Sequence, residues 1–365
     1  MWTQTRLTAL LGIDLPIVQG PFGGGYSTPA LAAAVSNAGA LGSLGAANLG
    51  PDEILAVVRD IAGRTARPFN INLWVPIPGE DDASIEQSRF DRTVARIAPF
   101  LEAAGLPLPT FPIPKAIAFE AQVEALLAAC PPVFSFVMGV PDRAILEAAR
   151  GRGIKTIGTA TTVDEAVAIE AAGADAVVAS GSDAGGHRGS FLRPVEASLV
   201  GTFSLVPQMA KAVRIPVIAA GGVATGAGVA AALTLGADAV QIGTAFLAAP
   251  ESGAPAAHKA LLGTDRARWT RLTRVFSGRF ARGIENALMN TLTSDDALPY
   301  PMHNALMMPL RRAAAKAGKL DWLALWAGQN AASARLLPAA EIVRLLAEET
   351  DDVLAADRLR PRSPA

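Results

Sequence analysis

The chain is poor in cysteine and has no excess of basic residues, and each shortage excludes a class of protein. Its 365 residues include one cysteine, Cys130, which can form neither an internal disulfide nor a cysteine metal cluster. We expect Cys130 to be a small core residue beside Pro131. The formal net charge is -1, so no surplus of cations is available for a phosphate backbone, and we predict no nucleic-acid partner.

Signals for export and for membrane insertion are also missing. Residues 1–6 do not form the basic head of a long apolar run, so we predict no signal peptide. The Ala-rich stretches are interrupted by Gly, Pro, Asp or Arg before they reach the roughly 18 apolar residues of a membrane span. We therefore expect a cytoplasmic protein without membrane contact. No acidic cluster and no pair of histidines has metal-ligand spacing, so no metal is predicted.

The chain does have ample material for a folded core, with 51% hydrophobic and 18% charged residues. Short apolar strands alternate with longer Ala-rich helices. The strands are expected at 16–20, 40–44, 68–73, 133–138, 155–158, 175–179, 216–220 and 239–242. Two junctions, 171–177 and 234–240, share the pattern Gly-Ala-Asp-Ala-Val, which favours a repeated βα unit. This pattern predicts an α/β fold, a (β/α)8 TIM barrel, because no Gly-x-Gly-x-x-Gly turn follows the first strand.

Two segments do not follow the alternation of strands and helices. Residues 76–114, after the third strand, are expected to form an insertion packed over one end of the barrel, either as a flexible lid or as a plain structural excursion. Beyond the barrel at 1–250 we expect a helical C-terminal extension, 251–365, packed on the barrel. Its helices are expected at 305–317, 322–334 and 339–359, with Pro309 and Gly328 as breaks. These apolar helices offer an interface for a homo-oligomer.

The stretch 177–191 carries the strongest functional signal. A buried strand ends at Ser180-Gly181, and a Gly-Gly turn then delivers His187 and Arg188. Histidine exchanges a proton near neutral pH, and catalytic residues of a (β/α)8 barrel lie at the carboxyl ends of its strands. We therefore predict that His187 is functional. Arg188 either steers an anionic substrate or makes a surface ion pair, and Asp183 either orients the loop or is solvated. Surface or packing roles are expected for the remaining histidines, His258 and His303.

Two later strand ends have the composition of a phosphate site. Gly221, Gly222 and Gly243 carry no Cβ, so backbone N–H groups can approach an anion, and Thr244 adds a hydroxyl. The alternative, that these glycines only serve tight turns, stays open. Neutral amides at other strand ends suit the edges of an uncharged heteroaromatic ring such as isoalloxazine; these are Gln19, Asn72 and Gln241.

On several such motifs the chain resembles the nitronate monooxygenase family, also called 2-nitropropane dioxygenases, which are FMN-dependent (β/α)8 barrels. The matching segments are PIVQGP (16–21), LAAAVSNAGALGSLG (31–45), FNINLW (69–74), SDAGGHRG (182–189), the run 216–247, SGRFARG (277–283) and WAGQ (326–329). They span most of the chain in the expected order. The combination of AGGHRG with the later AAGG and QxGTAFL is specific, whereas each glycine pair alone is not.

The resemblance implies roles for individual residues. His187 matches the catalytic histidine of the family. The positions that match FMN contacts or the flavin-facing loop, together with their neighbours at the same strand ends, are Pro21, Phe22, Gly23, Asn72, Ser180, Gly185, Gly186, Ala220, Gly221, Gly222, Gln241, Ile242, Gly243 and Thr244. Ser180 stands where many members have a glutamine that touches the flavin. The chain has only two tyrosines, Tyr26 and Tyr300, whereas one class of the family uses several in its site.

The resemblance also implies an activity. Electrons from an alkyl nitronate would pass to FMN and then to O2, giving a carbonyl compound and nitrite, while His187 would take a proton from a nitroalkane or hold the nitronate. Three alternatives stay open. They are an FMN-dependent enoyl-ACP reductase that consumes NAD(P)H, a non-catalytic flavin- or phosphate-binding barrel, and an oxidase of another small acidic carbon compound.

Overall fold

A closed barrel of parallel strands forms the centre of the protein. The computed structural model describes residues 1–77, 85–111 and 117–356. Eight strands pair in the order β1-β9-β8-β6-β5-β4-β3-β2, and a parallel bridge between Val18 and Leu41 joins the first to the last. Their bounds are β1 Ile17–Gln19, β2 Gly42–Gly45, β3 Phe69–Trp74, β4 Val133–Val137, β5 Lys155–Ala160, β6 Ala176–Ser180, β8 Val217–Ala220 and β9 Ala239–Ile242. The predicted (β/α)8 TIM barrel is confirmed.

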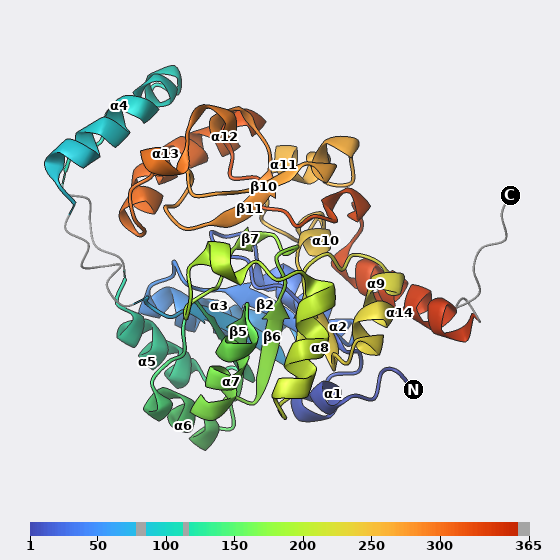
Figure 1. Ribbon diagram of the computed structural model, residues 1–365. Coiled ribbons are helices and arrows are strands. Elements are labelled where there is room, and N and C mark those ends of the chain that lie inside the picture. The colour runs from blue at the N-terminus through green and yellow to red at the C-terminus, as the bar shows by residue number, and fades with distance from the viewer. Residues whose placement is uncertain (78–84, 112–116, 357–365) are drawn as a thin grey trace, which may run out of the picture.

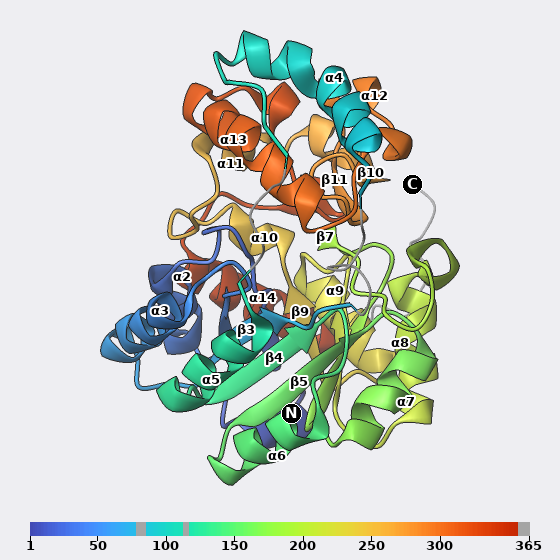
Figure 2. The same ribbon diagram turned by 90° about the vertical axis from the view of Figure 1, so that its left-hand side faces the viewer.

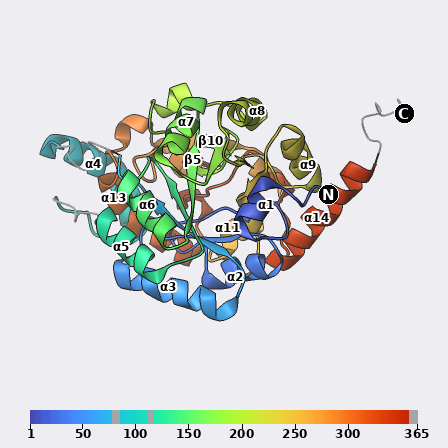
Figure 3. The same cartoon turned by 90° about the horizontal axis from the view of Figure 1, so that it is seen from below.

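Helices surround this barrel, as Figure 3 shows from below. They are α2 Pro29–Asn37, α3 Pro51–Arg64, α5 Phe119–Ala129, α6 Arg143–Gly151, α7 Val163–Ala172, α8 Thr202–Ala212 and α9 Gly226–Thr234. Local sequence explains where they begin. The Thr28 side chain accepts from the Leu31 N–H with Pro29 in the first helical turn, and Thr162 caps α7 in the same way. The main apolar core lies between these helices and the strands.

A short helix before the first strand, α1 Arg6–Leu11, was not expected from the sequence. Leu7 and Leu11 of α1 belong to the apolar cluster formed by the inner strand residues Val133, Val178 and Ile218. In Figure 1 α1 lies at the bottom of the barrel, at the end away from the C-terminal extension. The closed lower end leaves the carboxyl ends of the strands as the face on which a site can form.

The C-terminal extension covers that face (Figure 1). Its helices are α11 Ala256–Leu261, α12 Ala287–Thr291, α13 Met302–Ala317 and α14 Ala339–Ala355, and the short helix α10 Thr244–Leu247 precedes it directly after β9. The extension also contains two strands that the sequence analysis did not predict, β10 Thr270–Thr273 and β11 Ala281–Ile284. β10 pairs with β11, and β11 pairs with β7, Gly186–His187, so the three strands form an antiparallel sheet.

The helix expected at 322–334 is wrong. The chain there makes two 3-10 turns, η4 Leu320–Trp322 and η5 Ala331–Ser333, with an irregular segment between them. That segment makes backbone hydrogen bonds to β11 and to Asp183, far away in the chain, so tertiary contacts override the helix propensity of its sequence. The other two expected helices are present as α13 and α14, and Pro309 lies inside α13 without ending it. The end of the helix expected at 339–359 falls in 357–365, outside the described residues.

The insertion after β3 contributes α4, Gln87–Ala103. Its apolar side chains Phe90, Ile97 and Leu101 pack in one cluster with residues of α12 and α13, and Arg96 pairs with Asp296 at 2.9 Å. The helix therefore lies on the extension and not directly on the barrel (Figure 2). Residues 78–84 and 112–116 of the insertion lie outside the described residues, so the lid stays a prediction.

Cys130 is exposed, so its expected place in the core is wrong. It ends α5 in a left-handed conformation with φ of 51°, one residue after the last helical turn, where the side chain leaves the buried face of the helix.

None of the helices in the described part of the chain is long and apolar enough to cross a bilayer.

Candidate active site

A cavity of about 220 Å³ lies at the carboxyl ends of the strands, and residues of both the barrel and the extension line it. All of the predicted site residues line it except Ile242. The Ile242 side chain is fully buried in the main core, and its carbonyl oxygen accepts a hydrogen bond from the Gly20 N–H at 2.8 Å. Gln19 is also fully buried away from the cavity, where its Oε1 accepts from the Ser43 N–H at 2.8 Å. Its amide serves the barrel and does not reach a ligand.

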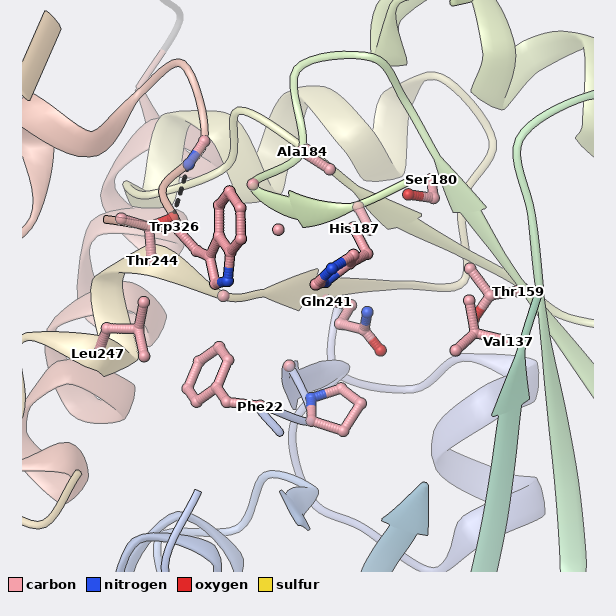
Figure 4. Close-up of a pocket in the computed structure, with 18 of the residues that line it drawn as sticks. Phe22, Val137, Thr159, Ser180, Ala184, His187, Gln241, Thr244, Leu247 and Trp326 are labelled. Atoms are coloured by element: carbon pink, nitrogen blue, oxygen red, sulfur yellow. Dashed lines mark hydrogen bonds between the residues drawn. The ribbon is translucent and has the colours of Figure 1, made fainter. Parts of the chain in front are cut away.

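One end of the cavity is built from the glycine pair after β8 and the start of α10. Gly221 and Gly222 have φ of 117° and 74°, a region that residues with a Cβ rarely adopt. The backbone N–H groups of Gly222 and Gly243 make no hydrogen bond to the described residues. The Thr244 hydroxyl accepts from the Gly328 N–H at 2.9 Å, which leaves its hydrogen to donate (Figure 4). These donors fit the phosphate of a nucleotide-type cofactor.

The loop between β6 and His187 is held rigidly. Arg188 is 2% exposed and donates to the carbonyl oxygens of Ser180 and Gly181 at 2.8 and 2.5 Å, so it neither steers substrate nor makes a surface ion pair. The Asp183 carboxylate accepts from the Thr202 N–H at 2.8 Å, so of its two alternatives the structure favours orienting the loop over a solvated side chain. Hydrogen bonds to the backbone carbonyls of Ser180 and Gly181 therefore fix the path of the loop.

A segment of the extension, residues 326–330, closes the other side of the cavity. A Cβ on Gly185 would lie 2.4 Å from the Ala327 carbonyl carbon and the Gly328 nitrogen, so only glycine allows this approach. The Gln329 N–H donates to the Asp183 carbonyl at 3.0 Å, and the Asn330 side chain donates to the Gly222 carbonyl at 2.8 Å. This clamp segment, 326–330, thus joins the His187 loop to the glycine pair after β8.

His187 lies in β7, where it pairs with Ala281 of β11. Its Nε2 is 2.8 Å from the Ser277 hydroxyl, and its ring stands edge-on between Trp74 and Trp326, at centroid distances of 4.9 and 5.3 Å. Figure 4 shows Trp326 beside the imidazole and Gln241 beneath it. Burial lowers the pKa of His187 from 6.5 to about 3, and the charges of Arg279 and Arg311 act in the same direction. The ring is neutral at physiological pH.

Sequence reasoning assigned no role to several side chains that line the cavity, namely Tyr26, Trp74, Leu247, Trp326 and Asn330. Two signals could have found the indoles. Trp74 follows Asn72 by two positions on β3, so both side chains point to the same side. Trp326 opens the WAGQ motif, which was noticed only as part of a family pattern.

The other two histidines have packing roles, as predicted. His303 is buried, with Nε2 at 2.9 Å from the Val275 carbonyl oxygen and Nδ1 accepting from the Leu298 N–H at 3.2 Å. His258 is fully buried, and neither ring nitrogen has a hydrogen-bond partner among the described residues. Burial lowers the pKa of each ring to about 4. Neither side chain lines the cavity.

Comparison with known proteins gives consistent results. The family model described as nitronate monooxygenase matches residues 4–349. A probable nitronate monooxygenase of Staphylococcus aureus (strain JH9) is 38% identical over 357 residues, covering 97% of this chain and 99% of the relative. The solved structure of a nitroalkane oxidase from Streptomyces ansochromogenes is 42% identical, with a TM-score of 0.88 over 96% of this chain and 99% of that one. FabK from Thermotoga maritima is 29% identical, with a TM-score of 0.75 over 96% and 97%.

Proposed function

Because this chain belongs to the nitronate monooxygenase family and is therefore an oxidoreductase, we propose that it uses FMN to oxidise small alkyl nitronates with O2 to a carbonyl compound and nitrite. One observation carries the proposal. A neutral, half-buried histidine stands at the carboxyl end of a barrel in the same cavity as a glycine-lined set of backbone donors. This combination supports a proton-handling group beside a site suited to a phosphorylated cofactor.

The residues present fit FMN. Gly222, Gly243 and Thr244 would hold its phosphate through backbone N–H groups and a hydroxyl. Asn72 and Gln241 would face the edges of the ring system, beside the loop Pro21, Phe22 and Gly23 and the neighbouring Gly185 and Gly186. When bound, the flavin supplies an acceptor for the electron pair of the substrate and returns it to O2.

His187 is the group of this chain that touches the substrate in the proposed reaction. Its Nε2 is engaged by Ser277, and its Nδ1 has no hydrogen-bond partner among the described residues. The Ser277 hydroxyl is also 3.3 Å from the Arg279 carbonyl oxygen, to which it can donate, so that its oxygen accepts from His187 Nε2–H. That arrangement leaves a lone pair on Nδ1. This lone pair can accept a proton, whether the substrate is a nitroalkane or another protonated form.

Purification followed by a nitrite assay tests the proposal. The protein should be yellow, should release FMN on denaturation, and should form nitrite from propyl-1-nitronate under air without any reductant. A colourless protein that does not take up FMN contradicts the cofactor assignment. A yellow protein that forms no nitrite contradicts the substrate assignment.

A second candidate, an FMN-dependent enoyl thioester reductase, is supported by the similarity to FabK from Thermotoga maritima. The nitroalkane oxidase is more similar in both sequence and structure, which favours the first candidate. The same preparation decides between them. Consumption of NAD(P)H with an enoyl thioester, in the absence of nitrite formation from a nitronate, would support the reductase.

A further inference from the structure

Four polar side chains lie in the interior of the barrel next to the cavity. Asn70 and Asn72 come from β3, Ser43 comes from β2 and Ser135 comes from β4. All four are buried, and of the four only Asn72 lines the cavity. The interior of a (β/α)8 barrel is ordinarily packed with branched apolar side chains, so a layer of neutral polar groups at this place requires an explanation.

Alternation along the strands puts these side chains inside the barrel. Val133 belongs to the inner apolar cluster, and Ser135 follows it by two positions on β4. Parallel pairing sets Asn70 beside Val133 and Asn72 beside Ser135, so both amides face the same interior. Ser43 is the register partner of Asn70 on the other neighbouring strand. The polar layer therefore lies between the apolar floor of the barrel and the cavity.

Hydrogen bonds join the four side chains into one network. Asn70 Nδ2 donates to the Ser43 hydroxyl at 3.2 Å and to the Ser135 hydroxyl at 2.8 Å. Asn72 Nδ2 donates to the same Ser135 hydroxyl at 2.9 Å. The Asn72 side chain has no other hydrogen-bond partner in the part of the chain that the structure describes, so its Oδ1 is available to a ligand in the cavity.

The network reaches a second wall of the cavity through Gln19. Gln19 Oε1 accepts from the Ser43 N–H at 2.8 Å, and Gln19 Nε2 donates to the Ser27 hydroxyl at 3.3 Å. The Ser27 hydroxyl also accepts from the Phe22 N–H at 2.9 Å. Because Phe22 lines the cavity, one chain of hydrogen bonds connects the loop after β1 with Asn72 on β3.

Stability alone does not account for this layer. Asn70 Oδ1 is buried without a hydrogen-bond partner among the described residues, a cost that an apolar side chain would avoid. Orientation gives a better account. The terminal torsion of an asparagine side chain is broad and roughly two-fold, so a free Asn72 amide could present either its oxygen or its nitrogen to a ligand. The bond from Nδ2 to Ser135 selects one of these orientations.

We infer that Ser135 is a positioning residue for the cofactor, which by holding Asn72 Nδ2 presents Asn72 Oδ1 to the ring edge of the flavin. An acceptor at this place suits an N–H group of the ring and not a ring carbonyl. The inference rests on the proposed function, in which Asn72 faces the ring system, and it adds the atom that does so and the residue that orients it. Ser135 does not line the cavity, so it acts only through Asn72.

A double-mutant cycle on FMN affinity tests the inference. Fluorescence titration of the full-length chain with FMN gives the dissociation constants. Asn72→Ala and Ser135→Ala should each weaken FMN binding about fivefold, the effect of one hydrogen bond. The double variant should bind no more weakly than Asn72→Ala alone, because the hydroxyl acts through the amide. Additive losses, or wild-type affinity in Ser135→Ala, would overturn the inference.

Ser198→Ala is the matched control. Ser198 is a fully buried serine outside the network, and its hydroxyl donates to the Pro194 carbonyl at 3.0 Å. This variant loses a buried hydroxyl in the same way and should bind FMN as the wild type does. An equal loss of affinity in Ser198→Ala and Ser135→Ala would indicate general destabilisation and contradict the role of Ser135.

The visible absorption spectrum of the bound flavin gives a second readout, which a general loss of stability does not move. Ser135→Ala should shift the flavin bands in the same direction as Asn72→Ala, and an unshifted spectrum in Ser135→Ala would count against the inference. A wild-type chain that binds no FMN would overturn the proposed function and this inference with it. A wild type that binds FMN without forming nitrite would contradict only the proposed substrate, and the cycle would still decide the role of Ser135.

Discussion

The imidazole of His187 receives its surroundings from three separate stretches of chain. Trp74 comes from β3, Ser277 precedes β11, and Trp326 opens the clamp segment. Each contact restricts the ring in a different way: the two indoles limit its tilt, and the hydroxyl selects a tautomer. The ring is consequently pre-oriented before any ligand arrives, as a group that must bind a substrate in one geometry requires.

Replacement of this ring should separate cofactor binding from turnover. His187→Ala leaves the phosphate end of the cavity untouched, so we expect wild-type FMN content and a loss of roughly a hundredfold in kcat/KM on a nitronate. Flavin absorbance per protein and nitrite release measure the two quantities. Ser277→Ala is the matched variant, which keeps the imidazole and should lose less. Full activity of His187→Ala would contradict the role given to His187.

The pH dependence of stability follows from the buried histidines. The pKa of His187 is lowered to about 3, and those of His258 and His303 to about 4, all from 6.5. Below pH 6.5 the unfolded chain therefore binds more protons than the folded protein. The stability present above that pH is lost as the pH falls toward 4, by up to about 1.4 kcal/mol per pH unit for each ring.

Urea unfolding at several pH values between neutrality and mild acid measures this slope. His258→Phe is an informative control, because the ring nitrogens it removes have no partners among the described residues and the replacement loses no hydrogen bond. The variant should be at least as stable as the wild type near neutrality and should lose less stability in acid. An unchanged slope would show that His258 is not held neutral.

At the scale of elements, the clamp segment and β7 decide whether the cavity is closed. In the described part of the chain, β7 pairs with no strand but β11, and the clamp segment contacts both the His187 loop and the turn after β8. Backbone-to-backbone contact at Gly185 leaves no room for a side chain. The extension is therefore part of the site and not an appendage of the barrel.

Gly185→Ala tests the clamp. A new Cβ would meet the backbone at Ala327 and Gly328, neither of which can rotate away, so the clamp and the loop must separate. We expect weaker FMN binding, by about tenfold or more, together with reduced activity. Gly63→Ala, in α3 with open space around it, is the control and should bind FMN normally. Fluorescence titration with FMN compares the two, and equal affinities would contradict the role of the clamp.

At the scale of the whole molecule, the extension returns to the barrel at its end. Ile342, Val343 and Leu346 of α14 belong to the main core cluster, and Glu349 accepts from the Gly226 N–H of α9 at 2.9 Å. Figure 1 shows α14 beside α9, on the flank of the barrel. The proposed boundary near residue 250 thus divides one continuous apolar core, and this interface buries side chains from both parts.

Truncation should reveal this dependence. A fragment of residues 1–250 loses α14, the clamp segment and β11, so it exposes part of the barrel core and has an incomplete cavity. We expect it to be insoluble or to lack cooperative unfolding, and not to retain FMN. Circular dichroism with thermal unfolding and flavin content measure both. A cooperatively folded fragment that binds FMN would show that the barrel is autonomous.

The strand positions, the barrel and most of its cavity-lining residues could be read from the amino-acid order alone. Periodicity, helix caps and glycine stops are local signals, and the rules for parallel strands bring all carboxyl ends to one face. For that reason the pairs Gly221-Gly222 and Gly243-Thr244, and His187 itself, were found without a structure. The family resemblance added their assignment to FMN, which stays a prediction.

Contacts between residues far apart in the chain decided the features that the sequence did not predict. The Ser277 hydroxyl is 90 residues from His187 along the chain, and no local pattern predicts that pairing. The helix expected at 322–334 is absent because its residues bond to distant loops, and Cys130 is exposed because the helix before it ends one residue earlier. Ile242 lies at a strand end as expected, yet side chains alternate along a strand, so Gln241 faces the cavity and Ile242 faces the core. The closed cavity arises only when the extension folds over the barrel, because burial is a property of packing and not of sequence order.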